Sequence, residues 1–487
     1  MPDQEAGSAE ARPAVRDAAF YVGAILTALF MLRVLGASWS GGFPAAWPDA
    51  VFPREGYLAV AAKGPFRFSF YDAFRPIGYP ILLWITGRNT QLTVVAQAAM
   101  YCAAVGALIM TALRVLRVRA VAVTAAVLIG LIALQAKYAM WTTQILSESL
   151  AISLGFAAVA AWWRFAAAPT RARARWGFLF LLAWLVVRDA HVLPATIVFV
   201  PVMALVVVLG RKSLERALRK TLVIGTVLVV VTAAYSYFAQ SASHRARLSV
   251  HNTIGVRVLP DEQLTNWFAD HGMPLDDALR TRTGKSGLAD DFYKSTDPEF
   301  AAYRRWAGGP GARAIALSLV LQAPHSFDLL YEDLPTLLPG DVSYYDTQGV
   351  YDRLPRELPA QLGGPTTRRR LTTWLVLAGV SLGAGLALAL LRKRGLGIVV
   401  FGATTLVVTL VEFYTTWGGD PLEMQRHLIG TMSRLAVILL VVVASGVDTA
   451  IDAWHSRPPR EEEPPPDPMP WETAYSAEDA SKVTPDA

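Results

Sequence analysis

The sequence predicts an all-α polytopic membrane protein of about ten transmembrane helices, with a large first external loop and a small external α-rich cap. Three observations predict this fold. Hydrophobic residues make up 53% of the 487 residues, which is more than a single soluble core accommodates. The apolar residues fall into ten runs, most of them close to the length that a membrane span needs. Arg and Lys gather in short clusters between these runs, as they do in cytoplasmic loops.

In chain order, the runs cover residues 18–35, 91–113, 120–134, 145–163, 177–187, 192–210, 222–238, 373–391, 396–414 and 428–447. The first run is too long for a signal-peptide core, so we expect it to remain as an anchor. The fifth run is short. However, about 35 residues lie between Arg175 and Arg211. As one straight helix they would be roughly 52 Å long, which is too long for a hydrocarbon core of about 30 Å. We therefore expect two short spans there.

The basic clusters predict the orientation of the bundle. The clusters within residues 114–119, 164–175, 211–220 and 392–394 fall on one side of a ten-span topology, which is expected to be cytoplasmic. Residues 368–370 are an exception on the other side, at the end of a long loop where this rule is weak. Both termini are then cytoplasmic.

The same topology divides the chain into four parts. We expect an N-terminal transmembrane bundle at 1–238 with a large external loop at 36–90, an external cap loop at 239–370, and C-terminal transmembrane helices at 371–455. Residues 456–487 are rich in Pro and Glu and cannot bury enough apolar surface to fold, so we expect a disordered cytoplasmic tail.

Several classes of function are disfavoured. The net charge of +6 comes with no aromatic-studded basic stripe, so we expect no nucleic-acid partner. The single cysteine, Cys102, lies inside an apolar run, which excludes a disulfide framework and a thiolate metal site. No zinc, dinucleotide, phosphate-loop, nucleophile-elbow or calcium motif occurs in the sequence.

Several ionisable residues do not belong to the basic clusters that orient the spans in the membrane. In the predicted topology these residues lie on the external side. Glu148 is in the first turn of a span, where an acid complements the helix N-terminus; a simple cap is the alternative. Arg188, Asp189 and His191 join the two short spans. Charges at that depth are costly unless they face a cavity or pair together, so an Arg–Asp pair is the alternative to a functional role.

A second external group opens the last span. Glu423, Arg426 and His427 stand at i, i+3 and i+4 and therefore share one helix face. Arg and His at an outward-facing helix N-terminus predict an anion or phosphate site, with a solvated intrahelical ion pair as the alternative. Glu412 ends the preceding span. Arg434, about two turns deeper, is expected to face the bundle interior or to extend its charge toward the interface.

The arrangement resembles the glycosyltransferase C superfamily of multi-span enzymes, which move a sugar from a polyprenyl-phosphate carrier to an acceptor outside the membrane. The resemblance is architectural over most of the chain. It rests on an acid-bearing first external loop, on Arg75-Pro-Ile-Gly-Tyr-Pro80, on Ser147-Glu148, on Arg188 before an apolar span, and on Glu423-x-x-Arg426-His427.

Such families place a catalytic acid a few residues before a Tyr of a short interfacial helix. Tyr57 is the equivalent Tyr, but Asp49 precedes it by eight residues and Pro53 and Arg54 occupy the nearer positions. This departure leaves an inactive homologue as an alternative.

The resemblance implies a carboxylate base among Asp72, Asp49 and Glu55, with Asp72 favoured because it adjoins Arg75. It also implies that cations stabilise the lipid phosphate as it leaves. No metal is needed if these cations suffice, although Asp49 and Asp72 would be ligands for a divalent metal. The expected substrate-binding residues are Arg75, Tyr79, Glu148, Arg188, His191, Glu423, Arg426 and His427.

The expected partners are a polyprenyl-phosphate-sugar donor, a glycan or lipid acceptor of the cell envelope, and the lipid bilayer. The amino-acid composition is rich in Ala, Arg and Val, which suggests a bacterium with a GC-rich genome. The expected location is therefore the bacterial plasma (inner) membrane. Two alternatives to an enzyme remain. One is a transporter or flippase of a lipid-linked or anionic solute, and the other is a non-enzymatic membrane scaffold.

Overall fold

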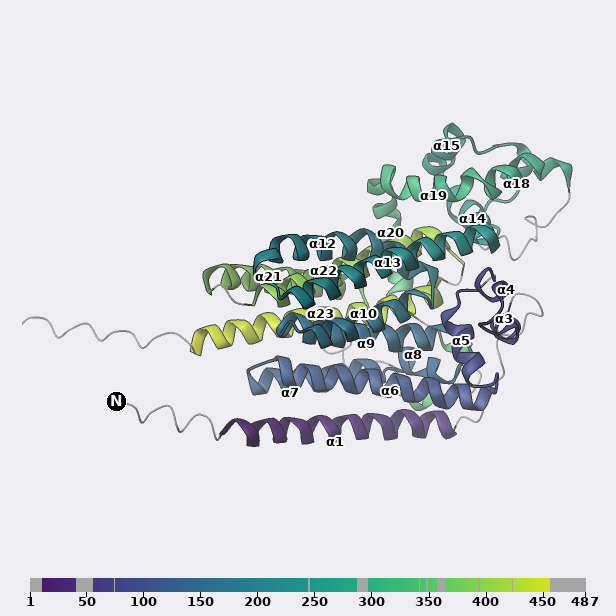
Figure 1. Ribbon diagram of the computed structural model, residues 1–487. Helices are drawn as coiled ribbons and strands as arrows, with labels where there is room; N and C mark the ends of the chain where they lie inside the picture. Colours follow the sequence, from purple (N-terminus) through teal and green to yellow (C-terminus); the bar gives the residue numbers. More distant parts are fainter. Residues whose placement is uncertain are drawn as a thin grey trace, which may run out of the picture.

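The computed structural model describes residues 11–40, 56–73, 75–243, 246–286, 297–340, 342–346, 349–356, 365–392, 395–422 and 424–455. Within these ranges every element is helical, which confirms the all-α fold. Long helices lie side by side in a bundle, with α1 (Ala11–Ser40) along one edge (Figure 1). Several short helices cover one end of the bundle (Figure 1).

Each of the ten predicted apolar runs contains a helix. After α1 these are α6 (Thr90–Val115), α7 (Arg119–Leu134), α9 (Ser147–Ala167), α10 (Arg171–Leu185), α12 (Val200–Leu209), α13 (Arg216–Ser243), α21 (Arg368–Arg392), α22 (Leu396–Gly419) and α23 (Met424–His455).

Among the described residues, seven helices are long and apolar enough to cross a membrane. An eighth span results if α7 is counted together with the segment Ala136–Thr143, from which it is bent by 66°. Two of the expected spans are too short to be counted among these helices. The helix α10 has 15 residues, and the apolar part of α1 covers only Tyr21–Ala37. The chain is therefore a membrane-embedded helical protein, and the count of ten crossings stays a prediction.

The core of the bundle is formed around α23 and α9. In α23, 94% of an apolar stretch of 18 residues is buried inside the protein, and in α9 the buried share of such a stretch is 72%. The corresponding shares are 17% in α21 and 28% in α13. A helix that is apolar all round and largely exposed needs lipid as its solvent, so α21 and α13 lie at the lipid boundary.

The helix is broken where two spans were expected between Arg175 and Arg211, although only the second segment, Asp189–Lys212, is long enough to be a candidate span. α10 ends at Leu185, and Arg188 has an extended backbone with φ −146° and ψ 137°. The chain then continues through the short helical segments η3 (Asp189–His191), α11 (Val192–Pro194) and the π-helical η4 (Ala195–Phe199) into α12. The extended residue ends one helix and turns the chain into the next, so the Arg188 side chain lies at a helix junction.

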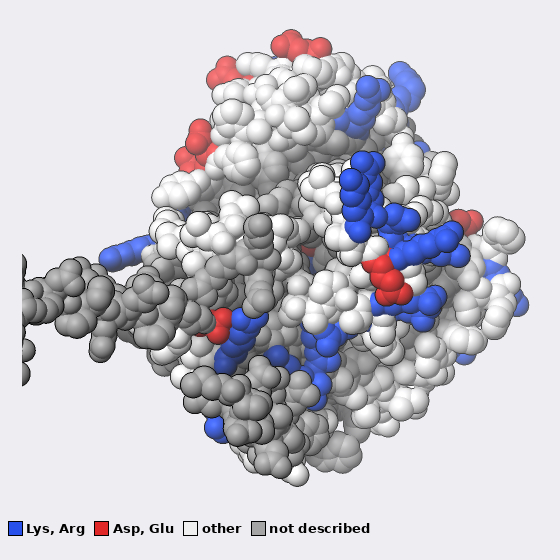
Figure 2. All heavy atoms as spheres, turned by 60° about the vertical axis from the view of Figure 1, so that its left-hand side comes forward, with Lys and Arg blue, Asp and Glu red and all other residues white. Residues whose placement is uncertain are grey.

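The two ends of the bundle differ in charge and in structure. Lys and Arg side chains gather on the face that Figure 2 brings forward, which is the end where α1 begins and α23 finishes. The opposite end carries the short helices α3 (Tyr57–Lys63), α4 (Phe68–Tyr71) and α5 (Gly78–Ile85) of the first loop (Figure 1). The same end also carries the cap, a group of short helices between α13 and α20 (Ala323–Leu337).

The cap has its own hydrophobic core, in which Val250, Ile254, Phe268 and Trp306 are buried together. The cap belongs to the loop between α13 and α21. A later part of the same loop, α20 (Ala323–Leu337), instead contributes buried leucines to the core of the bundle. The cap helices are α14 (Ala246–Thr253), η6 (Ile254–Val258), α15 (Glu262–Asp270), α16 (Asp277–Arg280), α18 (Ala301–Gly308) and α19 (Pro310–Leu321).

A polar anchor joins the cap to the turn between α22 and α23. Arg257 donates to the Trp417 carbonyl oxygen, and its guanidinium carbon lies 4.0 Å from the centre of the Trp417 indole. The indole Nε1 of Trp417 donates to Asp333 Oδ2 at 2.8 Å. Ser249 Oγ donates to Asp420 Oδ2 at 2.9 Å. Burial lowers the pKa of Arg257 to about 10, and the carboxylates of Asp333 and Asp420 oppose this shift. The cap is thus seated directly on the turn that precedes α23.

Candidate functional site

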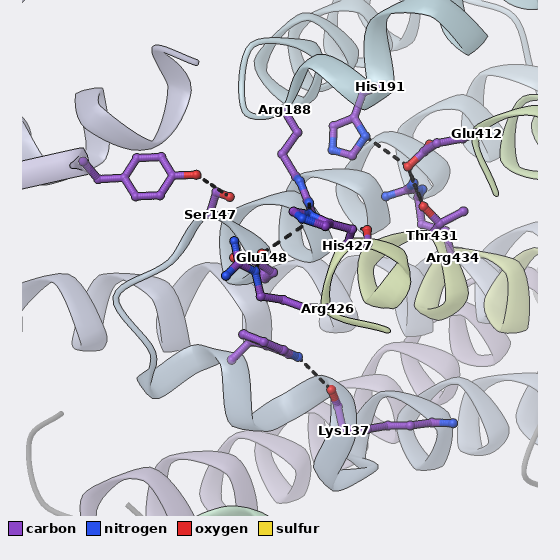
Figure 3. Close-up of polar contacts among 12 residues, drawn as sticks. Lys137, Ser147, Glu148, Arg188, His191, Glu412, Arg426, His427, Thr431 and Arg434 are labelled. Carbon is purple, nitrogen blue, oxygen red and sulfur yellow. Dashed lines mark hydrogen bonds and ion pairs between the residues drawn. The ribbon is translucent and has the colours of Figure 1, made fainter. Parts of the chain in front are cut away.

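Two arginines meet one buried carboxylate at the end of the bundle that carries the first loop. Glu148 lies in the first turn of α9, and its side chain is 1% exposed. Its Oε1 accepts a hydrogen bond from Arg426 Nε at 3.0 Å and lies 3.8 Å from Arg188 Nη1 (Figure 3). Three chain segments that are distant in sequence therefore meet at Glu148.

His427 completes this group. Arg188 Nη2 lies 2.6 Å from His427 Nδ1, and Arg188 Nη1 donates to the His427 carbonyl oxygen at 3.3 Å. A guanidinium has no acceptor, so Nδ1 must accept. The imidazole is then neutral and carries its proton on Nε2. Glu148, Arg188, Arg426 and His427 are called the arginine cluster below.

Aromatic side chains of the first loop and the cap loop adjoin the arginine cluster. The guanidinium carbon of Arg75 lies 5.0 Å from the centre of the Tyr57 ring. Tyr57 in turn donates from its hydroxyl to Ser147 Oγ at 3.0 Å, next to Glu148 in sequence. On the other side, the guanidinium carbon of Arg426 lies 5.7 Å from the ring of Tyr345. These contacts bring Arg75 to the edge of the cluster through Tyr57.

The Arg-Pro-Ile-Gly-Tyr-Pro element positions the first loop against the helix junction. Gly78 N donates to the Val186 carbonyl oxygen at 2.8 Å, and a Cβ at position 78 would lie 2.8 Å from that oxygen. Only glycine permits this approach. Tyr79 donates to Gln97 Oε1 at 2.6 Å. Burial raises the pKa of Tyr79 well above its ordinary value, and the negative charge of Glu148 adds to this effect.

A second buried ion pair lies deeper in the bundle and is called the inner network. Glu412 Oε1 accepts from Arg434 Nη2, from Thr431 Oγ1 at 2.6 Å and from His191 Nδ1 at 3.1 Å (Figure 3). The His191 ring stacks on Trp184 with 4.1 Å between the ring centres. The Arg434 side chain is 4% exposed and that of Glu412 is 1% exposed. Arg434 therefore faces the bundle interior, which was one of the two expected arrangements.

An apolar cavity of about 280 Å³ adjoins the inner network. Arg434 and Trp184 line it near the arginine cluster, and Pro169 and Leu396 line it near the basic end. Because α9 ends just before Pro169 and α22 begins at Leu396, the cavity follows much of the length of these helices. Arg434 Nη1 is buried and has no hydrogen-bond partner within the described part of the chain.

The structure brings together part of the residue set expected from the sequence. Glu148 contacts both Arg426 and Arg188, Arg188 contacts His427, and His191 belongs to the inner network. Arg426 is buried and pairs with Glu148 on α9, so it is not solvated as the alternative interpretation required.

The expected base is not part of this contact set. Asp72 follows α4 and is exposed, and its side chain makes no hydrogen bond or ion pair to the residues that the structure describes. Asp49, Glu55 and Glu423 lie outside the described residues. The assignment of the base stays a prediction.

Two features were missed by sequence reasoning. Gln97 Nε2 donates to the carbonyl oxygens of Thr142 at 3.0 Å and Gln144 at 2.9 Å, which ties α6 to the segment leading into Glu148. A glutamine within an apolar run was the available signal. The other missed feature is the anchor of Arg257 on Trp417, for which the sequence offers no comparable signal.

No group of three or more His, Cys, Asp or Glu that would suit a metal ion occurs within the described ranges. Asp72 belongs to no such group, and Asp49 lies outside those ranges. The described part of the site is thus a group of cationic side chains around one carboxylate. No family model and no curated protein matches this chain.

Proposed function

We propose that this protein is a membrane glycosyltransferase that moves a sugar from a polyprenyl-phosphate carrier to an acceptor on the extracytoplasmic face. The arginine cluster is the observation that supports this most strongly. Among the residues that the structure describes, Arg188 and Arg426 bring two positive charges to the one negative charge of Glu148, and Arg75 lies at the edge of the cluster. Excess positive charge at a buried site of a membrane protein favours an anionic ligand.

The donor groups suit a phosphate. Guanidinium groups bind phosphate oxygens through paired hydrogen bonds, and the Nε2–H of His427 is a further donor. Arg426 and His427 lie in the first turn of α23, where backbone N–H groups lack helical partners and favour negative charge. As the bond from the sugar to the phosphate oxygen breaks, these cations would stabilise the negative charge left on the carrier phosphate.

A lipid carrier is favoured over a soluble anion by the apolar cavity beside the inner network. It extends from Arg434 toward the basic end between α9, α10, α12, α22 and α23. An apolar chain would lose water contact there while its phosphate stayed near the arginine cluster.

The acceptor hydroxyl must lose a proton as its oxygen forms the new bond to the sugar. Asp72 is the favoured base because it is exposed on the first loop, where an acceptor arrives from outside; Asp49 and Glu55 are the alternatives. The buried Oε1 of Glu148 is occupied by Arg426, so Glu148 is assigned to positioning the arginines. Its Oε2 has no hydrogen-bond partner among the described residues and would accept from a substrate hydroxyl.

The proposed location is a bacterial plasma membrane, with both termini in the cytoplasm and the arginine cluster facing outward. The Lys and Arg side chains at the opposite end of the bundle support this orientation (Figure 2). The proposed acceptor is a glycan or lipid of the cell envelope.

A flippase for a lipid-linked solute is a second candidate, favoured by the inner network because buried ion pairs often line transport pathways. It predicts gradient-dependent movement of the lipid without bond cleavage. A scaffold acting through residues 456–487 predicts that deletion of this segment abolishes function, whereas the transferase should tolerate that deletion.

The proposal is tested by the binding of a polyprenyl phosphate, compared with the neutral polyprenol, to purified protein in detergent. We expect wild type to prefer the phosphate, and Arg188→Gln and Arg426→Gln each to reduce this preference roughly 10-fold or more. Arg67→Gln, which removes an exposed charge of the first loop, is the matched control and should leave the preference unchanged. Equal affinity of wild type for the two lipids would refute a phosphate site.

Catalysis is tested separately. Asp72→Asn should abolish sugar transfer while phosphate binding persists. Full transfer activity of that variant would remove Asp72 as the base.

A further inference from the structure

A second groove lies at the opposite end of α10 from Arg188. It is formed between α10 and α13 and has a volume of about 970 Å³. One part is lined by charged residues near the start of both helices, and the other by apolar residues one to three turns further along. The groove is therefore amphipathic along its length.

Four basic side chains line the charged part. Arg171 and Arg175 are one turn apart on α10, and Arg216 and Lys220 are one turn apart on α13, so each pair shares a helix face. Glu215 is the one acid among the lining residues, which leaves a net charge of +3 from four cations and one anion. All four basic residues are exposed, and none makes a side-chain hydrogen bond or ion pair within the described part of the chain.

The apolar part of the groove is open to its surroundings. Leu179 is 53% exposed, Ile224 is 49% exposed and Leu228 is 45% exposed. The floor is closed where the Phe178 ring packs on Gly225, since a Cβ at position 225 would lie 2.3 Å from the ring. The groove thus offers open apolar walls that begin directly beside unpaired cations.

We infer that this groove binds an anionic phospholipid of the membrane leaflet at the basic end of the bundle. The phosphate would lie among the four cations, and the acyl chains would follow the walls formed by Leu179, Ile224 and Leu228. Basic pockets between helices on the cytoplasmic side are recognised features of lipid-headgroup binding. A soluble phosphate would use the cations but leave the apolar walls without a partner.

This lipid site is independent of the proposed sugar transfer. It uses other residues and lies at the other end of the bundle, so it would persist in a transporter or a scaffold. Its ligand is a resident membrane lipid and not the sugar donor.

The test is native mass spectrometry of the full-length protein with equimolar phosphatidylglycerol and phosphatidylcholine. The test variant combines Arg175→Gln with Lys220→Gln. The matched control combines Arg211→Gln with Lys212→Gln, which removes the same charge from the same end of the bundle but not from the lining of the groove. Each basic residue is expected to contribute about fivefold to the preference for phosphatidylglycerol over phosphatidylcholine. The test variant should therefore show a preference roughly 30-fold weaker than that of wild type, and the control should keep the wild-type preference.

Three outcomes would overturn the inference. The first is equal binding of the two lipids by wild type. The second is an equal loss in the test and control variants, which would mean that only the overall charge of this end matters. The third is full displacement of phosphatidylglycerol by glycerol 3-phosphate at equal concentration, which would assign the cations to a soluble anion.

Discussion

Breaking the inner network should destabilise the protein more than removing any exposed charge. Arg434→Met leaves the carboxylate of Glu412 without its cation, and that side chain is 1% exposed. Glu412→Gln likewise leaves Arg434 without its anion. Removal of one partner of a buried ion pair costs about 3–5 kcal/mol, because the remaining charge is neither solvated nor paired. We expect each single variant to lose unfolding free energy in that range.

The double variant should recover most of this loss. With Glu412→Gln and Arg434→Met together, no charge remains buried at this position, and neutral replacement of a buried ion pair is often close to neutral for stability. The coupling energy between the two positions should therefore be about 3 kcal/mol or more. The unfolding free energy can be measured by steric trapping in bicelles.

Arg117→Met is the control for this cycle. Arg117 pairs with Asp452 at 2.6 Å, but its side chain is 67% exposed, so its loss should cost less than about 1 kcal/mol. Single variants at Arg434 and Glu412 that cost no more than this control would refute the reasoning. A double variant as unstable as the sum of the two single variants would refute it as well.

Three further perturbations address the first loop and the cap. Gly78→Ala places a methyl group against the Val186 carbonyl oxygen and should cost about 1–3 kcal/mol of local packing, reducing binding of polyprenyl phosphate without loss of membrane insertion. Burial, assisted by the charge of Arg247, lowers the pKa of His251 to about 4 from 6.5. The unfolded cap thus binds more protons between these values, so its unfolding free energy should fall by about 3 kcal/mol as the pH drops from 7 to 4, measured by hydrogen exchange. Arg257→Lys loses the forked contacts of the cap anchor and should weaken cap docking by about 1–2 kcal/mol, measured as faster proteolysis of the cap.

Each of these has a control at a similar residue. Gly379→Ala adds a methyl group where no atom lies within 4 Å and should have no effect on lipid binding. His271 is exposed, so His271→Asn should leave the pH profile of the cap unchanged, whereas His251→Asn should flatten it. Arg356→Lys changes an exposed arginine outside the anchor. Any control that reproduces the effect of its partner would contradict the corresponding argument.

The positions of the long helices could be predicted from the sequence because apolar runs report burial in lipid directly. The junction at Arg188 followed from length alone, since one helix between Arg175 and Arg211 would exceed the bilayer. The division of the long external loop could not be predicted. Leucines of α20 pack into the bundle core while Phe268 and Trp306 pack in the cap, and both sets give similar amphipathic patterns.

The candidate site could be predicted as a set of residues but not as contacts. Arg426 and His427 were placed on one helix face by their spacing, and Glu148 was placed at a helix start. Nothing in the sequence relates the start of α9 to the start of α23, because that contact depends on how the helices pack. The pairing of Arg434 with Glu412 was not predicted for the same reason, although each residue was identified as unusual for its depth.

The anchor of the cap on the turn before α23 has a consequence for the order of events at the arginine cluster. Thr253 of the cap donates to the Gly419 carbonyl oxygen at 2.9 Å, and Arg426 follows only seven residues later in the chain. A displacement of the cap would therefore shift the start of α23 and with it one of the two cations at Glu148. We expect the occupancy of the two regions to be thermodynamically coupled. A molecule that holds the cap in place would then tighten phosphate binding, and bound phosphate would tighten the hold on that molecule by the same factor.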